Sequence, residues 1–376
     1  MLLSEDHQAV QDAVRQFVQA EIKPHAAAWD KSGQFPAAQL RGLAALGCYG
    51  VAVPTEYGGA GLDYLALALM LEEIAAGDGA TSTIVSVNNC PVCSILMAFG
   101  NEDQKQRFLK PLARGDMLGA FCLTEPHVGS EAGGLKTSAV LDGDDYVLNG
   151  VKQFITSGKN GDVAIVMAVT DKAAGKRGIS AFLVPTATPG YTVARVEDKM
   201  GQHASDTAQI LFDNCCVPAA NRIGDEGQGL KIALSGLEGG RIGIASQALG
   251  MARAAFEVAL AYSKDRKAFG VPIFEHQAVQ FKLADMATQI EATRQLIWHA
   301  ACLKDAGRPC LKEAAMAKLM ASEMAEAVCS GAIQVLGGYG YLSDFPVERI
   351  YRDVRVCQIY EGTSEVQKIL IGRALA

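Results

Sequence analysis

The chain has 376 residues, of which 49% are hydrophobic and 20% are charged, and its formal net charge is -7. This length can bury a large core and suggests two or three structural units. Because the chain is acidic and its Lys and Arg residues form no clusters, nucleic acid is not expected as the main partner. No apolar run reaches the roughly 18 residues that a membrane helix needs, so no membrane span is expected.

The N-terminus and the cysteines indicate the compartment. The first residues are acidic and lack both a basic n-region and an Arg-rich transit pattern, which is typical of a mature soluble start. The ten cysteines are scattered, and Cys90-x-x-Cys93 is the only metal-like spacing, with no second pair after it. We therefore expect core cysteines, no metal site and a reducing, cytoplasmic location.

Residues 1–118 are predicted to be helical. Ser4 is placed to cap a first helix whose apolar residues recur on one face. Further helices are predicted at about 36–47, 63–77, 80–99 and 101–115. A loop rich in Pro and Gly separates the first two of these.

Strand patterns replace helical ones from about residue 119. β-branched residues and alternation dominate at 146–148, 163–166, 180–184 and 208–212. Turn signals rich in Asp, Gly and Pro separate these runs at short intervals. Such spacing favours a small antiparallel barrel or sandwich, which we assign to residues 119–224.

Helix returns at about residue 226 and continues to the end of the sequence. The periodic segments are 228–265, 275–306, 311–336, 346–355 and 363–375. Long helices with short connections favour an up-down bundle. The expected fold class is thus α+β, with an N-terminal all-α domain (1–118), a middle antiparallel β-barrel domain (119–224) and a C-terminal four-helix bundle (225–376). No G-x-G-x-x-G motif follows a predicted strand, so a Rossmann nucleotide site is not expected.

Two strand ends in the β block carry groups that suit a flat ring or a phosphate. Residues 121–130 combine a Pro, a Gly and two hydroxyls, and residues 152–158 offer an aromatic face and a hydroxyl. Free backbone N–H groups at such ends suit a heteroaromatic ring with acceptor atoms, or a phosphate. Taken singly, each stretch is also explained by ordinary strand-to-turn chemistry.

Two helix ends in the C-terminal block have a similar ambiguity. The run Tyr262-x-x-x-Arg266-x-x-Phe269-Gly270-x-Pro272-Ile273 places a cation and an aromatic ring before a sharp break. Its simpler interpretation is a helix C-terminus, where the dipole favours Arg266. The run 334–341 ends a helix with close backbone approach, and a plain Schellman-type stop is the alternative.

The stretch 358–365 places a carboxylate, Glu361, between Tyr360 and Gly362. Thr363 is placed to cap the following helix, so Glu361 lies on a bend rather than on a solvated helix face. Gly362 allows another molecule to approach the backbone closely. An apolar setting disfavours the charged carboxylate and raises its pKa towards that of a useful general base. The alternative interpretation is a surface glutamate in a turn.

Together these stretches resemble the acyl-CoA dehydrogenase family, and overall its short-chain or short-branched-chain branch. The resemblance covers essentially the whole chain through five ordered motifs: Leu-Thr-Glu-Pro-x-x-Gly-Ser, Ile-Thr-x-Gly, Arg-x-x-Phe-Gly-x-Pro-Ile, Gln-x-Leu-Gly-Gly-x-Gly-Tyr and Ile-Tyr-Glu-Gly-Thr-Ser-Glu. It implies an FAD-dependent oxidoreductase of fatty-acid β-oxidation that converts an acyl-CoA to a trans-2-enoyl-CoA. It also implies an electron-transfer flavoprotein as acceptor and a homotetramer built as a dimer of dimers.

The resemblance also implies which residues bind FAD. In the β block these are Phe121, Leu123, Thr124, Ser130, Phe154, Ile155 and Thr156. Residues that reach the FAD of a neighbouring subunit are Arg266, Phe269, Gln277, Gln334, Val335, Leu336, Gly337 and Gly338. The turn at the adenosine end matches Thr363, Ser364 and Glu365.

The reaction residues follow from the same resemblance. Positions that match substrate contacts are Ser130, Glu238, Gly239, Gly240, Arg241, Tyr360 and Gly362. Glu361 matches the catalytic base, which takes the α-proton while the β-hydride goes to flavin N5. Its backbone N–H, with the flavin ribityl chain, is implied to bind the thioester carbonyl. Glu238 is a weaker candidate for the base.

Three positions depart from the family pattern: Phe154 stands for the usual tryptophan, Glu131 for an aspartate and His203 for an arginine. These would alter flavin packing or the coenzyme A contact but leave the base in place. In the isovaleryl branch the base directly precedes the arginine at 241, where this chain has Gly240. Two alternatives keep the fold: an oxidase, desulfinase or monooxygenase, and a DNA-associated flavoprotein, which the net charge disfavours.

Overall fold

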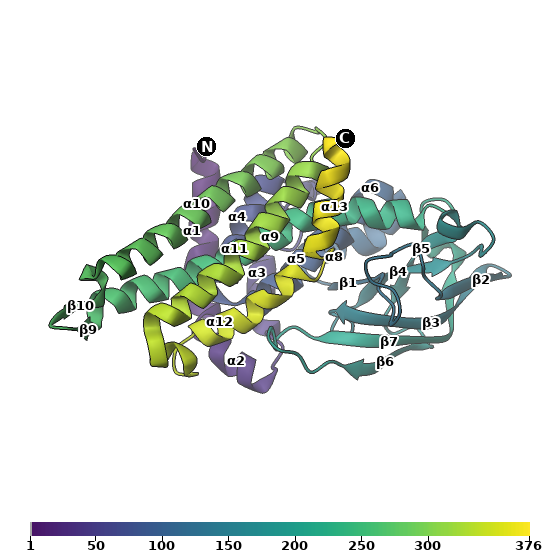
Figure 1. Cartoon of the computed structure of the whole chain (residues 1–376). Coiled ribbons are helices and arrows are strands. Elements are labelled where there is room, and N and C mark those ends of the chain that lie inside the picture. The colour runs from purple at the N-terminus through teal and green to yellow at the C-terminus, as the bar shows by residue number, and fades with distance from the viewer. Residues whose placement is uncertain (1) are drawn as a thin grey trace.

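The structure, a computed structural model, describes residues 2–376. It has a helical N-terminal region, a β region and a helical C-terminal region, and the β region lies to one side of the long helices (Figure 1). The N-terminal helices are α1 (Glu5–Phe17), α2 (Ala26–Ser32), α3 (Ala37–Ala45), α4 (Tyr64–Gly77), α5 (Gly79–Val87), α6 (Ser94–Phe99), α7 (Glu102–Gln104) and α8 (Lys110–Arg114). The predicted cap of the first helix is confirmed, because Ser4 Oγ accepts a hydrogen bond from His7 N at 3.2 Å.

The N-terminal helices α4 and α5 are buried almost throughout. Residues 79–99 form a helical stretch that is long and apolar enough to cross a membrane by length and composition alone. In this structure, however, 72% of its apolar window is buried inside the protein. Cys90 departs from helical geometry within this stretch.

The β region is one mixed sheet of eight strands with the order β6-β7-β3-β2-β4-β5-β8, and β1 pairs with β4. The strands are β1 (Gly119–Cys122), β2 (Ser138–Asp142), β3 (Asp145–Thr156), β4 (Val163–Val169), β5 (Ile179–Pro185), β6 (Tyr191–Val196), β7 (Thr207–Pro218) and β8 (Arg222–Ile223). The structure differs from the antiparallel barrel that the sequence predicts. Strands β1 and β2 each pair with β4 in parallel, and within residues 2–376 no pairing joins β6 to β8.

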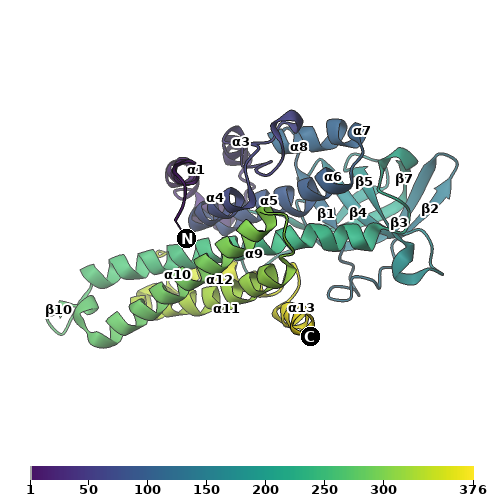
Figure 2. The same cartoon turned by 90° about the horizontal axis from the view of Figure 1, so that it is seen from above.

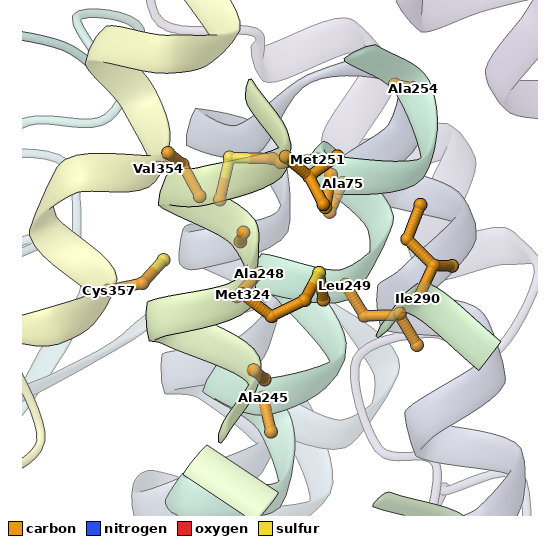
Figure 3. Close-up of a cluster of buried hydrophobic side chains, with 14 of the residues drawn as sticks. Ala75, Ala245, Ala248, Leu249, Met251, Ala254, Ile290, Met324, Val354 and Cys357 are labelled. Atoms are coloured by element: carbon orange, nitrogen blue, oxygen red, sulfur yellow. The ribbon is translucent and has the colours of Figure 1, made fainter. Parts of the chain in front are cut away.

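The C-terminal region confirms the predicted long helices to within two residues at each end. They are α9 (Gly229–Asp265), α10 (Gln277–Asp305), α11 (Leu311–Leu336), α12 (Val347–Val354) and α13 (Ser364–Leu375), with the hairpin β9 (Lys267–Ala268) and β10 (Val271–Pro272) after α9. Small side chains on α9 let α11 pack closely against it, and Figure 3 shows Ala245 and Ala248 of α9 beside Met324 of α11. We propose that the domain boundaries lie near residues 118 and 224, in the connections between these regions.

The N-terminal and C-terminal helices are joined by a buried cluster of charges. Glu72 and Glu73 of α4 are almost fully buried. Arg253 Nε lies 3.0 Å from Glu72 Oε1, and its Nη2 lies 2.7 Å from Glu73 Oε2. Arg294 pairs with Glu72 at 3.0 Å and Arg15 pairs with Glu73 at 2.8 Å. Because each buried carboxylate has cationic partners, the cluster fixes how the two helical regions dock.

Candidate active site

The turn that carries Glu361 has an unusual backbone. Glu361 has φ = 53° and Gly362 has φ = 91°, so both residues are left-handed. Such a φ is strained for a non-glycine residue and is kept only where the surroundings hold it. Thr363 caps the following helix as predicted, since its Oγ1 accepts a hydrogen bond from Val366 N at 3.4 Å. Within residues 2–376 the backbone N–H of Glu361 donates to no acceptor, so it is available to a ligand.

The Glu361 side chain points into the protein towards α9. Its Oε2 atom is buried and has no hydrogen-bond partner among residues 2–376, although other atoms of the residue reach the surface. Arg241 on α9 is only 4% exposed, and its Nε and Nη1 atoms likewise lack partners in the described part of the chain. Buried polar atoms are almost always hydrogen-bonded, so orphaned atoms gathered in one place indicate a site for a polar ligand.

Burial raises the pKa of Glu361 to about 7, while the positive charges of Arg241 and Lys318 pull the pKa down. Desolvation therefore outweighs attraction, because taking the carboxylate out of water disfavours its charged form. A carboxylate with a pKa near neutrality can accept a proton and release it again at physiological pH. This is the property of a general base.

Successive residues of α9 face different groups around the site. An added Cβ on Gly240 would collide with the carboxylate of Glu361, and one on Gly239 would lie 3.1 Å from the sulfur of Cys90. Glu238, the weaker candidate for the base, pairs with Lys304 Nζ at 3.1 Å, and its carboxylate accepts a hydrogen bond from Cys310 Sγ at 3.4 Å. Its carboxylate is thus engaged with the end of α10 and the start of α11.

The structure brings the two predicted strand ends of the β region together. Gln153 N donates to the carbonyl oxygen of Thr124 at 2.8 Å, which joins the segment after β1 to the end of β3. Phe154 has φ = 60°, and its side chain is 63% exposed. Of the other residues predicted here, Leu123 and Ile155 are buried, Phe121 and Thr156 are half-buried, and Ser130 is exposed.

A buried ion pair fixes these strand ends. Lys152 Nζ lies 2.9 Å from Glu125 Oε1 and donates to Leu123 O at 3.0 Å. Glu125 also accepts hydrogen bonds from the backbone N–H groups of Lys136 and Thr137, at 2.8 and 3.0 Å. Glu125, the glutamate of the Leu-Thr-Glu-Pro motif, therefore has a structural role, because its ion pair and hydrogen bonds hold the loop in place.

The remaining predicted FAD residues lie elsewhere. In both views the β9–β10 hairpin stands at the end of the long helices opposite the sheet, while α13 lies at the end nearer the sheet (Figures 1 and 2). Phe269 on this hairpin is 97% exposed. A cavity of about 540 Å³ nearby is lined by Tyr262, Arg266, Ile273, Val335, Leu336, Gly337, Gly338, Tyr339 and Leu342. Gln277 and Gln334 are exposed. One chain does not bring the two groups of predicted FAD residues together.

Only part of the turn at 363–365, which was predicted to bind the adenosine end of FAD, is accessible at the surface. Ser364 is buried, and its Oγ donates to Glu323 Oε1 of α11 at 2.6 Å. Glu365 is exposed. Tyr360, the residue before the candidate base, donates from its hydroxyl to Gln247 Oε1 of α9 at 2.6 Å.

The sequence analysis missed three residues that contact the Glu361 turn. They are Lys318 and Gln367, which bind its carbonyl oxygens, and Gln247, which binds Tyr360. Lys318 carried a signal, since it interrupts a run of alanine and methionine that would otherwise be wholly apolar. Gln247 and Gln367 carried none, because a glutamine in a helix is ordinary.

His203, one of the three departures from the family pattern, contacts α2 rather than Glu361. His203 Nδ1 lies 2.9 Å from the Asp30 carboxylate of α2, and its Nε2 lies 2.6 Å from Lys199 O. His203 therefore joins the β6–β7 connection to α2. A cavity of about 720 Å³ beside it is lined by α2 and the segment after it, the β3–β4 turn, the end of β6, the β6–β7 connection and α12. None of the predicted site residues lines it.

Comparisons with known proteins agree with this geometry. Residues 4–116 match the acyl-CoA dehydrogenase N-terminal domain, residues 120–215 the middle domain and residues 227–376 the C-terminal domain of the same family. The matched segments together span nearly the whole chain.

Individual relatives are similar over most or nearly all of their length. The chain is 49% identical over 369 residues to the mitochondrial short-chain specific acyl-CoA dehydrogenase of Homo sapiens, covering 98% of this chain and 90% of that protein. It matches the structure of butyryl-CoA dehydrogenase from Megasphaera elsdenii with a TM-score of 0.97 and 43% identity, over 100% of this chain and 99% of that one. A chain in the structure described as the electron transferring flavoprotein of Acidaminococcus fermentans matches with a TM-score of 0.98 and 46% identity, over 100% and 99%.

Proposed function

This chain belongs to the acyl-CoA dehydrogenase family, and from that premise we propose that Glu361 removes the α-proton in its FAD-dependent dehydrogenation of a short-chain acyl-CoA. Members of the family are FAD-dependent oxidoreductases, so the chain is a flavoprotein enzyme. Two observations carry the role of Glu361: its buried Oε2 has no hydrogen-bond partner among residues 2–376, and the pKa of its carboxyl group is raised to about 7.

The residues of the β region fit FAD. The exposed ring of Phe154 offers an apolar face, and its left-handed backbone turns that ring out of the sheet. Thr124 and Thr156 are half-buried residues at the two joined strand ends, and each carries a hydroxyl. We therefore assign the flavin ring to Phe121, Leu123, Thr124, Phe154, Ile155 and Thr156. When bound there, FAD supplies the acceptor for a hydride from the β-carbon of the substrate.

The chain's own groups handle the proton. The α-proton of a thioester is weakly acidic, so its removal requires stabilisation of the charge that develops on the carbonyl oxygen. The free backbone N–H of Glu361 can donate to that oxygen, while Oε2 of the same residue accepts the α-proton. Burial strengthens the carboxylate as a base, and the charge of Arg241 keeps enough of it ionised to act.

Completion of the FAD site by a second copy explains the separation of its predicted residues. Phe269, Gly337 and Gly338 have open space around them at the far end of α9 to α11. Such residues would reach the FAD of a neighbouring subunit in a two-fold assembly. We propose a homotetramer made of two such dimers, in which α9, α10, α11 and α13 act as a four-helix bundle.

The acceptor and the compartment are parts of the same proposal. The similarity to a chain described with an electron transferring flavoprotein supports such a protein as the electron acceptor. Apart from Cys302, the cysteines are free thiols and most of them are buried, which supports a reducing location such as the cytoplasm. A role in β-oxidation accords with the short-chain relatives.

Anaerobic titration of the purified flavoprotein with straight and branched acyl-CoA esters tests the proposal. We expect the flavin to bleach with butyryl-CoA and its close homologues, and to bleach more slowly as the acyl chain lengthens. A protein that takes up no FAD, or whose flavin no acyl-CoA bleaches, would contradict it. Fast reoxidation by air without an electron-transfer flavoprotein would indicate an oxidase instead.

A further inference from the structure

Lys318 is a buried cation that the proposed reaction does not yet use. It lies on α11 among alanines, and its side chain is 0% exposed. Its ammonium donates a hydrogen bond to the carbonyl oxygen of Gly362 at 2.7 Å. Lysine is almost never fully buried, because removing an ammonium from water is costly unless a partner compensates for it. Here the partner is the turn of the candidate base.

Two side chains hold the carbonyl oxygens of this turn from opposite helices. Gln367 of α13 donates from Nε2 to Gly362 O at 2.8 Å and to Glu361 O at 3.2 Å, and it is fully buried. Lys318 reaches the same Gly362 oxygen from α11. These contacts fix both left-handed residues, and so they fix the direction in which the Glu361 side chain leaves the turn.

Burial and several neighbouring titratable groups act on the pKa of Lys318. Burial lowers the pKa of Lys318 to about 8, the charges of Cys357 and Glu361 raise it, Arg241 lowers it and Glu323 raises it. The ammonium therefore keeps its proton at neutral pH. Glu361 in turn faces the two cations, Arg241 on α9 and Lys318 on α11.

Glu361 also influences a thiol on the N-terminal side. Its charge contributes to the raised pKa of Cys90, which burial raises most. Cys90 is therefore neutral and does not oppose the carboxylate. The two cations are thus the charged groups that favour the ionised form of Glu361.

We propose that Lys318 is a positioning residue for Glu361: its ammonium holds the Gly362 carbonyl so that the carboxylate faces Gly240, and it places a positive charge beside the turn that carries that carboxylate. The proposal rests on the function proposed above. It differs from a purely structural role because removal of the charge must change the basicity of Glu361 as well as the stability of the fold.

The experiment compares Lys318→Met with Gln367→Met in the FAD-loaded protein. Both substitutions remove a hydrogen bond to Gly362 O, but only the first removes a charge. We expect both to slow flavin bleaching by butyryl-CoA about tenfold to a hundredfold, with little change in the KM for that substrate. Only Lys318→Met should move the acid limb of the rate profile, by about one pH unit to higher pH.

A second measurement, urea unfolding, detects the effect of the Lys318 charge on Glu361 without catalysis. Glu361→Gln should stabilise the protein to urea at about pH 8, and this gain should be larger in the Lys318→Met background than in the wild type. This readout stands even if no acyl-CoA bleaches the flavin, so failure of the proposed function and failure of the role of Lys318 are distinguishable. If Lys318→Met does not fold, Lys318→Gln, which keeps a donor without the charge, takes its place.

The proposal would be overturned if Lys318→Met leaves the acid limb of the rate profile unshifted and Glu361→Gln gives the same gain in stability to urea in both backgrounds. A wild-type bleaching rate in Lys318→Met would overturn it as well. A shifted limb in Gln367→Met would also contradict it, since that residue carries no charge.

Discussion

The carboxylate of Glu361 packs against Gly240 of α9, so closely that a side chain on Gly240 would occupy the same space. The two residues are 121 positions apart in the sequence: Gly240 lies within α9, and Glu361 lies on the turn before α13. The absence of a side chain at 240 is therefore what admits the candidate base into the core. Glycine costs helix stability in such a position, and this contact gives the physical reason for it.

Replacing Gly240 by alanine should displace the carboxylate. We expect flavin bleaching by butyryl-CoA to slow by about a hundredfold, since a shift of about 1 Å in a catalytic group has an effect of that size. Stopped-flow absorbance under anaerobic conditions measures it. Gly372→Ala is the matched control, because a Cβ added there would meet no atom within 4 Å in the described part of the chain, apart from its neighbours and the backbone of its own helix. Equal rates in the two variants would mean that Glu361 does not act from this place.

Glu361→Gln should leave the protein folded and yellow but nearly inactive. The amide fits the same space and cannot accept the α-proton, so bleaching should fall by about 10³-fold or more. Flavin content from absorbance and folding from circular dichroism are measured on the same samples. Glu21→Gln, at an exposed position of the N-terminal region, controls for the loss of a negative charge. Full activity in Glu361→Gln would remove the assignment of the base.

The pH dependence follows from the raised pKa of Glu361, about 7 in the folded protein against an ordinary 4.5. The rate of bleaching should rise with pH through about 7, because only the ionised carboxylate accepts a proton. Stability should respond in the opposite sense. The folded state binds this proton more tightly than the unfolded chain, so ionisation costs stability as pH rises from 4.5 to 7.

Urea unfolding of wild type and Glu361→Gln checks this sign. The variant should be more stable by up to about 3 kcal/mol at about pH 8, and the difference should vanish below about pH 4.5. A constant difference at all pH values would show that the carboxylate titrates normally.

Phe269→Ser should weaken assembly and flavin binding together. The ring is 97% exposed on the β9–β10 hairpin, where a second copy would bury it. Loss of such an aromatic anchor weakens association about tenfold to a hundredfold. Sedimentation and flavin content across a dilution series measure both effects. Leu141→Ser, which changes an exposed apolar residue of β2, is the control. On dilution it should keep its assembly size and flavin content as well as the wild type does. A Phe269→Ser protein that keeps its size and flavin would contradict the shared site.

Arg253→Met should destabilise the junction of the helical regions by about 3 to 5 kcal/mol. The substitution removes one cation from the buried carboxylates of Glu72 and Glu73. Urea unfolding measures the loss. Arg107→Met, which removes an exposed pair with Asp103, should change stability by no more than about 1 kcal/mol. Equal effects of the two substitutions would mean that the cluster is well solvated.

The same cluster gives a second pH dependence. Burial opposes the charge of Glu73, but Arg15 and Arg253 outweigh it and lower the pKa of Glu73. Its contribution to stability is present above the ordinary pKa of 4.5 and is lost as pH falls through the lowered value. Arg253→Met should therefore make the protein less sensitive to acid than the wild type is, relative to its own stability at neutral pH.

Local patterns were enough to predict most of the helices of this fold, although α2 and β6 were not predicted. The periodicity of apolar residues predicted the three long helices, and Ser4 and Thr363 were correctly predicted to cap α1 and α13. Both features depend on residues within one or two helical turns. The motifs gave Glu361 on a bend for the same reason. The parallel pairing of β1 and β2 with β4 was not predictable, because alternation within a strand does not say which strand lies beside it.

The site itself depended on the tertiary structure. Gly240, Arg241 and Lys318 come from two helices, and only the packing of α11 on α9 places them around Glu361. The raised pKa of Glu361 is likewise a result of burial, which no neighbour in the sequence supplies. The local sequence was enough to identify Glu361 as the candidate base. The packing of distant helices determined its pKa, the direction of its side chain and the cations beside it.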